Sequence, residues 1–190
     1  MTESPLADPS GDSTALRAFC EHFRLKPGSR QEALVEEVAT AFSALPYENL
    51  TKVLKHDREG GVVRRGPEEV IGDHLRLGSG GTCFSLTAAL LQEAGLRVGL
   101  YTSPHLADVR ERIRIGGLPL EEEPWLEGMR RLAPHFEAVG ATFFEMMTSL
   151  ALDTFREVGV EVGVLEVGLG GRLDATNVCH PVATAITAID

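Results

Sequence analysis

The sequence contains very little lysine. Its 18 Lys and Arg residues include only three lysines, Lys26, Lys52 and Lys55, and none follows Lys55. The 28 Asp and Glu residues leave a formal net charge of −10. An acidic chain without a basic cluster offers little to a polyanion, so we expect neither nucleic acid nor a membrane as a main partner. The residues after Lys55 also lack the side chain with which many phosphate loops neutralise phosphate charge.

Long apolar runs and paired cysteines are absent as well. No stretch approaches the roughly 20 apolar residues that a membrane helix needs. The polar residues 1–13 lack the positive start and apolar run of a signal peptide. The three cysteines, Cys20, Cys83 and Cys179, are irregularly spaced, which excludes a disulfide framework and a cysteine zinc site. We therefore expect a soluble protein of the reducing cytoplasm.

The pattern that is present belongs to an α/β protein. Apolar periodicity and glycine breaks predict helices at 83–94, 125–139 and 143–158, strands at 96–101, 112–115, 160–167 and 182–189, and a hairpin turn at 116–117. The last two strands are apolar and β-branched, which is typical of central parallel strands. We expect a helical N-terminal segment that leads into a partial, mostly parallel sheet with flanking helices.

Four motifs in the second half occur in the order in which a known enzyme family carries them. They are YTSPHL at 101–106, ERIRI at 111–115, TFFE at 142–145 and LEVGLGGRLDATN at 165–177. Through these motifs, residues 88–190 resemble the folylpolyglutamate synthase / dihydrofolate synthase family of the Mur ligase superfamily. The resemblance implies a P-loop-like sheet, with ATP and Mg²⁺ as cofactors. It also implies an amide ligase, in which a carboxylate of a folate or pteroate is phosphorylated and the amine of glutamate attacks the acyl phosphate.

Glu166 has the clearest physical role in these motifs. It ends an apolar strand, where a carboxylate can hold Mg²⁺ beside a phosphate, although on its own it could equally be a solvated strand end. The resemblance implies that Ser103 and Glu166 ligate Mg²⁺. It also implies that the 168–177 loop borders the nucleotide and pterin pockets, and it assigns to the substrate pocket His105, Gly170, Arg172, Asp174 and Asn177.

The phosphate loop departs from the family's pattern. The family carries G-T-N-G-K-G-S, and the corresponding residues 76–82 read R-L-G-S-G-G-T, with glycine at the lysine position. Backbone N–H groups could still form an anion nest at a helix N-terminus. The predicted nucleotide-binding residues are Gly78, Ser79, Gly80, Gly81 and Thr82. Because loss of the lysine removes a charge-assisted phosphate contact, we expect weak or no ligase activity from this chain.

The first half carries a different likeness. Residues 45–50 read LPYENL and residues 80–85 read GGTCFS, and through them residues 15–97 resemble the arylamine N-acetyltransferase family of transglutaminase-like thiol enzymes. Cys83 lies at a predicted helix N-terminus, where the helix dipole lowers a thiol pKa, so it is the candidate nucleophile. The alternative is a small buried core residue. The histidine base and the carboxylate that such an enzyme needs have no counterpart in the chain.

We interpret the chain as a mosaic of these two likenesses. It comprises a flexible leader at 1–13, a helical acetyltransferase-like segment at 14–87 and a partial folate-ligase-type ATPase domain at 88–190, truncated on a predicted strand. Ligase chemistry is the first hypothesis, with folate or pteroate, glutamate and ATP as its small-molecule partners. Cys83-dependent acyl transfer and a non-catalytic fusion fragment are the alternatives. A sheet cut at a core strand would leave an apolar face uncovered, which makes self-association possible.

Overall fold

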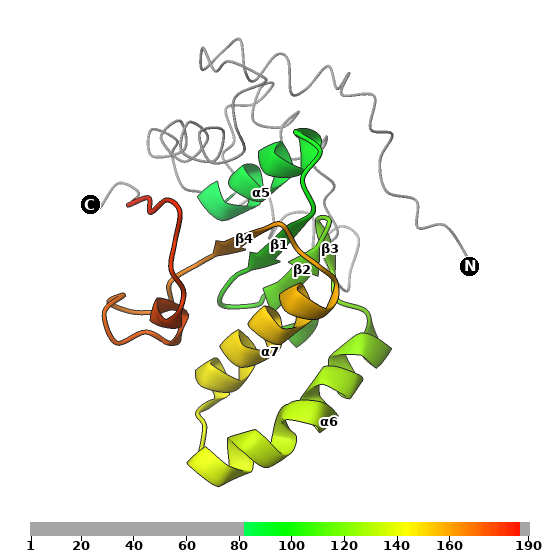
Figure 1. The fold of residues 1–190 in the computed structure, drawn as a ribbon, viewed down its shortest axis with the longest axis vertical. Helices are drawn as coiled ribbons and strands as arrows, with labels where there is room; N and C mark the ends of the chain where they lie inside the picture. The colour runs from blue at the N-terminus through cyan, green and yellow to red at the C-terminus, as the bar shows by residue number, and fades with distance from the viewer. Residues whose placement is uncertain (1–81, 187–190) are drawn as a thin grey trace.

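The computed structural model describes residues 82–186, which form a mixed α/β unit with one sheet between helices (Figure 1). Its elements, in chain order, are α5 (Cys83–Glu93), β1 (Val98–Tyr101), the 3-10 helix η1 (Val109–Arg112), β2 (Ile113–Ile115), β3 (Leu118–Pro119), α6 (Glu122–Val139), α7 (Phe143–Glu157), β4 (Val162–Leu165) and the 3-10 helix η2 (Ala175–Val178). The predicted leader, most of the predicted N-terminal segment and the phosphate-loop residues Gly78, Ser79, Gly80 and Gly81 lie outside the described residues. The boundary predicted between residues 87 and 88 falls inside α5, which is a continuous helix.

The sheet has the strand order β3-β2-β1-β4. The expectation of a mostly parallel sheet is wrong for the described strands. Only β1 and β4 run parallel, whereas β1 with β2 and β2 with β3 are antiparallel. Gly116 and Gly117, with φ of 57° and 78°, make the two-residue turn between β2 and β3. A two-residue turn joins antiparallel strands only, which is the physical reason for the difference.

Two of the predicted strands also differ from expectation. The strand expected at 160–167 is shorter, and as β4 it lies at one edge of the described sheet rather than at its centre. The part of the strand expected at 182–189 that is described, up to residue 186, is not in a strand. Val182 and Ile186 are exposed there. An apolar, β-branched run becomes a strand only when a neighbouring strand pairs with it, and the described residues show no such pairing for this run.

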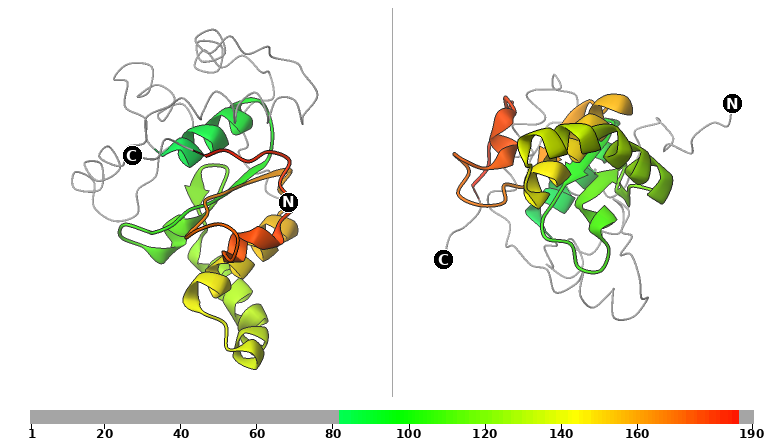
Figure 2. Two further views of the ribbon diagram at one scale, coloured as in Figure 1. Left: turned by 90° about the vertical axis from the view of Figure 1, so that its left-hand side faces the viewer. Right: turned by 90° about the horizontal axis from the view of Figure 1, so that it is seen from below.

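The two faces of the sheet are covered by different helices, and β1 supplies side chains to both faces because successive residues alternate. Val98 and Leu100 join the apolar cluster of α5. Tyr101 joins the opposite cluster, which α6 and α7 complete. Figure 2 shows the sheet between α5 on one side and α7 on the other, with α6 packed against α7.

Glycine permits the close contact between α7 and β1. A Cβ built on Gly99 would lie 2.6 Å from the Phe155 ring, so only a residue without a side chain fits under that ring. The capping box of Thr142 and Glu145 fixes the start of α7. Among the described residues, no helix is long and apolar enough to cross a membrane.

Candidate active site at the carboxyl edge of the parallel strands

The two parallel strands end at the same edge of the sheet. Tyr101, the last residue of β1, is paired with Leu165, the last residue of β4. The predicted metal ligands Ser103 and Glu166 follow directly, so the fold brings them to one place. α5 packs against both of these strands, β1 and β4. In α/β sheets, ligands bind at such an edge.

Glu166 is held by both strands. Its backbone N–H donates to the Tyr101 carbonyl oxygen at 2.9 Å, and its Oε2 accepts the Ser103 backbone N–H at 2.7 Å. The structure therefore brings the Glu166 carboxylate against the backbone of Ser103. In the part of the chain that is described, no three His, Cys, Asp or Glu side chains gather into a metal-binding group. A Mg²⁺ ion that keeps several waters and binds one or two carboxylates fits such a sparse ligand set.

Tyr101 connects this edge to the helical layer. It is fully buried, and its hydroxyl accepts a hydrogen bond from the Thr148 hydroxyl of α7 at 3.1 Å. Its backbone carbonyl accepts the N–H of Glu166. Burial raises the pKa of the Tyr101 hydroxyl, so the phenol keeps its proton and acts as a structural link.

Thr82 is the one predicted nucleotide-binding residue that the structure describes. It is the N-cap of α5, where its Oγ1 accepts the Ser85 backbone N–H at 3.2 Å and lies 2.7 Å from the Ser85 hydroxyl. The first turn of α5 carries no acidic residue. The positive end of the helix is therefore not neutralised by its own side chains.

Cys83 lies in the core cluster of α5 and is 6% exposed. Burial raises the pKa of its thiol, and the nearby charge of Glu166 raises that pKa further. This direction is opposite to the one expected from the helix dipole. The structure therefore favours the core alternative for Cys83 over an activated nucleophile.

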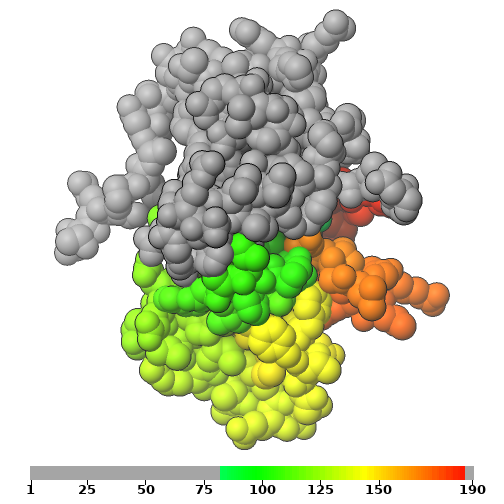
Figure 3. Space-filling view, turned by 180° about the vertical axis from the view of Figure 1, so that it is seen from behind, coloured from blue at the N-terminus to red at the C-terminus, as the bar shows by residue number. Residues whose placement is uncertain are grey.

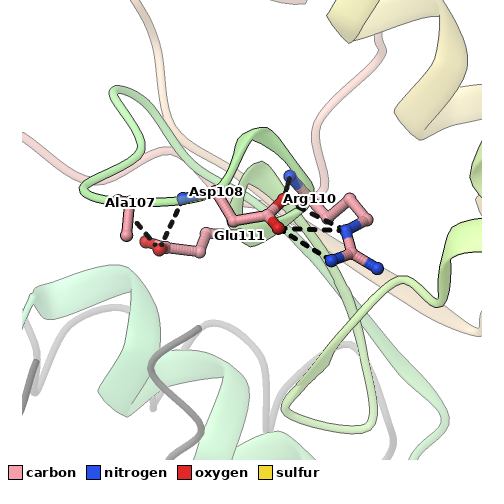
Figure 4. Close-up of polar contacts among 4 residues, drawn as sticks. All are labelled: Ala107, Asp108, Arg110 and Glu111. Carbon is pink, nitrogen blue, oxygen red and sulfur yellow. Dashed lines mark hydrogen bonds and ion pairs between the residues drawn. The ribbon is translucent and has the colours of Figure 1, made fainter. Parts of the chain in front are cut away.

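The loop after β1 is organised by a carboxylate that sequence reasoning missed (Figure 4). Glu111 is fully buried, and its two oxygens accept the backbone N–H groups of Leu106, Ala107 and Asp108 at 3.0 to 3.1 Å. Asp108 and Glu111 form a capping box around η1. The spacing Asp-x-x-Glu was the available signal in the sequence. These bonds fix the loop that carries Ser103 and His105.

Asp108 makes a second set of contacts in the same loop. Its carboxylate pairs with the Arg110 guanidinium at 2.7 Å, on the surface. The hydrogen bond from Arg110 holds the pKa of Asp108 below its usual value. Figure 4 shows the Arg110 guanidinium on the opposite side of Asp108 from the Glu111 carboxylate.

His105, predicted in the substrate pocket, contacts a buried arginine. The Nε of Arg112 donates to His105 Nδ1 at 2.9 Å. The same guanidinium lies over the Phe143 ring, 5.3 Å from its centroid. Arg112 belongs to the ERIRI motif and Phe143 to the TFFE motif, so the fold brings three of the four motifs together here.

The loop after β4 contains the other predicted pocket residues. Asp174 Oδ2 accepts the N–H groups of Gly168 and Leu169 at 3.0 and 2.9 Å, and Oδ1 accepts the Thr176 N–H and hydroxyl at 3.0 and 2.6 Å. Partial burial acts to raise the pKa of Asp174, but the bonds from Thr176, Leu169 and Gly168 outweigh it and lower that pKa. This carboxylate therefore stays ionised and holds the loop.

The remaining residues of that loop are exposed or bonded within it. Gly170 adopts a left-handed conformation with φ of 70°. The Asn177 side-chain amide donates to the Arg172 carbonyl oxygen at 2.9 Å, and the Arg172 side chain is exposed. Figure 3 shows this segment, in orange, protruding from the side of the molecule. The loop returns to the helical layer, because η2, whose N-cap is Asp174, contacts α7.

Sequence comparison supports one of the two expected likenesses. The chain is 44% identical over 114 residues to a probable bifunctional folylpolyglutamate synthase/dihydropteroate synthase of Haloferax volcanii, and this match covers 57% of the chain and 14% of that protein. It is 37% identical over 162 residues to folylpolyglutamate synthase of Arabidopsis thaliana, with 82% of the chain and 24% of that protein covered. The chain is thus similar to folylpolyglutamate and dihydrofolate synthases. It spans only about a quarter or less of these two relatives.

The plant match extends further toward the N-terminus than the resemblance read from the sequence. A match over 82% of the chain reaches beyond residues 88–190. These relatives give no support to the acetyltransferase likeness. No protein-family model matches the chain. A solved bifunctional folylpolyglutamate synthase/dihydrofolate synthase from Yersinia pestis, complexed with AMPPNP and a Mn ion, has 29% identity and a TM-score of 0.47, covering 90% of this chain and 38% of that one.

Proposed function

We propose that this chain carries the metal- and nucleotide-binding edge of an ATP-dependent ligase that adds glutamate to a folate or pteroate. The observation that carries the proposal is the 2.7 Å contact between the Glu166 carboxylate and the Ser103 backbone, at the shared end of β1 and β4. The similarity to folylpolyglutamate and dihydrofolate synthases supports it. The N-terminus of α5, which packs on β1 and β4, supplies the backbone donors and the positive dipole that a nucleotide phosphate needs.

In this proposal each residue has a distinct task. Glu166 and the Ser103 hydroxyl hold Mg²⁺. Two hydrogen bonds keep the carboxylate in place before the ion binds: the Glu166 N–H donates to the Tyr101 carbonyl oxygen, and the Ser103 N–H donates to the Glu166 carboxylate. When bound, MgATP supplies the phosphoryl group that activates the substrate carboxylate. The α5 N-terminus, capped by Thr82, orients the phosphates.

The same proposal predicts a slow enzyme. No lysine follows Lys55, so the α5 N-terminus must bind phosphate with backbone donors alone. A charge-assisted contact to a phosphate is about twice as strong as a neutral hydrogen bond. We therefore expect detectable MgATP binding together with weak ligase turnover.

Titration calorimetry with MgATP tests the proposal. We expect the intact chain to bind MgATP and E166Q to lose that binding. Glutamine keeps an oxygen that accepts the Ser103 N–H, so this variant removes the charge while preserving the loop. E137A, which removes an exposed carboxylate of α6, serves as the matched control and should bind normally. Absence of binding at millimolar nucleotide, or unchanged binding by E166Q, would refute the proposal.

A further inference from the structure

Thr148 is a buried residue of α7, and only 2% of its surface is exposed. A threonine in a helix can satisfy its hydroxyl within that helix, and Thr148 Oγ1 donates to the Phe144 carbonyl oxygen at 2.9 Å. The same hydroxyl also donates to the Tyr101 hydroxyl at 3.1 Å. Thr148 does not need this second bond to satisfy its own hydroxyl. The bond therefore serves as a connection from the helix to the sheet.

Tyr101 lies between this helix and the proposed metal ligand. It is the last residue of β1, and its carbonyl oxygen accepts the Glu166 backbone N–H at 2.9 Å. Glu166 follows Leu165, the last residue of β4, so this bond holds Glu166 to β1 just beyond the paired strands. The Glu166 carboxylate in turn accepts the Ser103 N–H at 2.7 Å. The direction of this carboxylate therefore depends on the position of the Tyr101 peptide.

The Tyr101 side chain links its hydroxyl to its peptide with little freedom. The residue is fully buried, and its ring has only the χ1 and χ2 rotations, so a bond at the hydroxyl restrains the direction of the Cα–Cβ bond. A close-packed interior transmits displacements instead of absorbing them. The bond with Thr148 thus ties the position of α7 to the peptide that holds Glu166.

We propose that Thr148 is a positioning residue for the proposed metal ligand Glu166 and that it acts through Tyr101. This inference rests on the proposed function and deepens it by naming a residue of the helical layer that tunes metal affinity at the sheet edge. Groups that orient a metal ligand raise its affinity, because a ligand that is free to turn loses that freedom when the ion binds. Thr148 itself contacts neither the ion nor a substrate in this role.

Thr154 provides a matched control within the same helix. It is also buried, with 8% of its surface exposed. Among the residues that the structure describes, only the Thr148 hydroxyl of this pair bonds to a strand. T148V and T154V each replace a buried hydroxyl of α7 by a methyl group. Only T148V therefore removes a bond to the sheet.

Amide hydrogen exchange of the full chain, followed by NMR without metal or nucleotide, tests the link itself. We expect T148V to speed exchange at the Glu166 amide relative to the Val164 amide by about five-fold, the factor for one net hydrogen bond. Val164 lies inside the same strand pair, so a general loss of stability would speed both amides equally. T148S, which keeps the hydroxyl, and T154V should leave the ratio unchanged.

Titration calorimetry with MgATP tests the consequence for the metal. T148V should bind about three-fold to ten-fold more weakly, somewhat less than the loss typical of groups that orient a metal ligand directly. T148S should retain the affinity of the intact chain. Y101F removes the other hydroxyl of the bond, so adding T148V to Y101F should weaken binding no further.

Several outcomes would overturn the inference. One is an unchanged ratio of Glu166 to Val164 exchange in T148V, whether or not the chain binds MgATP. Others are equal MgATP affinity of T148V and the intact chain, effects of T148V and Y101F that add, or a T148S variant that behaves like T148V. Failure of the intact chain to bind MgATP overturns the proposed function instead, and the exchange ratio still decides whether Thr148 positions Glu166.

Discussion

The two loops that follow the parallel strands use the same device in different surroundings. After β1, the carboxylate of Glu111 gathers three backbone N–H groups and is fully buried. After β4, the carboxylate of Asp174 gathers three N–H groups and one hydroxyl of its loop and is only partly buried. Leu169 and Leu173, beside Asp174, are 86% and 96% exposed.

Because the two carboxylates accept similar numbers of hydrogen bonds, we expect burial to decide how much each one contributes to stability. A hydrogen bond in a dry interior is electrostatically stronger, and a donor left unpaired there has no water to replace its partner. The loop after β1 should therefore behave as part of the core. In the loop after β4, water can replace part of the hydrogen bonds that a substitution removes, so the loss of stability should be smaller.

The largest effect is expected at Glu111. E111A removes a fully buried carboxylate whose oxygens accept three backbone N–H groups, and it should lower the free energy of unfolding by about 3 kcal/mol or more. Urea denaturation measures this change. E111Q should lose less, because one oxygen remains. A loss below about 1 kcal/mol for E111A would show that burial does not separate the two loops.

Gly168 tests the packing of the second loop. A Cβ at this position would lie 2.6 Å from the Phe144 ring and 3.0 Å from Asp174 Oδ2. G168A should therefore cost about 1–3 kcal/mol by overpacking. Thermal unfolding measures it. G170S is the comparison in which the space is open, so that its cost comes from the left-handed φ of 70° and not from overpacking. If G168A were neutral, the loop after β4 would be freer to move than the contact with Phe144 implies.

Asp174 should make stability depend on acid. Its folded-state pKa lies below its unfolded value, so its contribution is fully present above the unfolded pKa of about 4 and is lost as the pH falls through the folded value. D174N should cost about 1–2 kcal/mol at neutral pH and flatten this acid loss. Urea denaturation at a series of pH values checks both. An unchanged acid profile in D174N would contradict the role of its charge.

The smallest effect is expected at Arg110. It pairs with Asp108, and both side chains keep about a quarter of their surface exposed, so solvent still screens part of the attraction. R110A should leave the melting temperature unchanged within error, although it lies one residue from Glu111. A marked loss in thermal melts would mean that the surface of this loop contributes as its buried centre does.

Local patterns in the sequence predicted most elements of this fold. The helix expected at 143–158 is found at Phe143–Glu157, because the Thr142–Glu145 capping box and Gly159 mark its ends locally. The hairpin turn at 116–117 was likewise predicted from its two glycines. The position of β4 at the edge of the described sheet was not, since composition reports burial and strand propensity but not which strand pairs with which.

The candidate site divides in the same way. The family resemblance pointed to Ser103 and Glu166, and the fold brings them together. The sequence did not predict the structural roles of Glu111 and Arg112. Those roles depend on burial, and the sequence does not show whether a charged residue is buried. Cys83 was assigned a helix-terminus effect, but it lies in the core, where desolvation outweighs the dipole.

Tyr101 has a consequence for substitutions far from the sheet edge. Its hydroxyl is hydrogen-bonded to the Thr148 hydroxyl of α7, and its carbonyl oxygen accepts the backbone N–H of Glu166. A shift of α7 would therefore move the Tyr101 side chain, and the Tyr101 backbone would move the proposed metal ligand Glu166 with it. A substitution in the core beneath α7 should therefore alter the affinity of Glu166 for the metal ion, even when the protein remains folded.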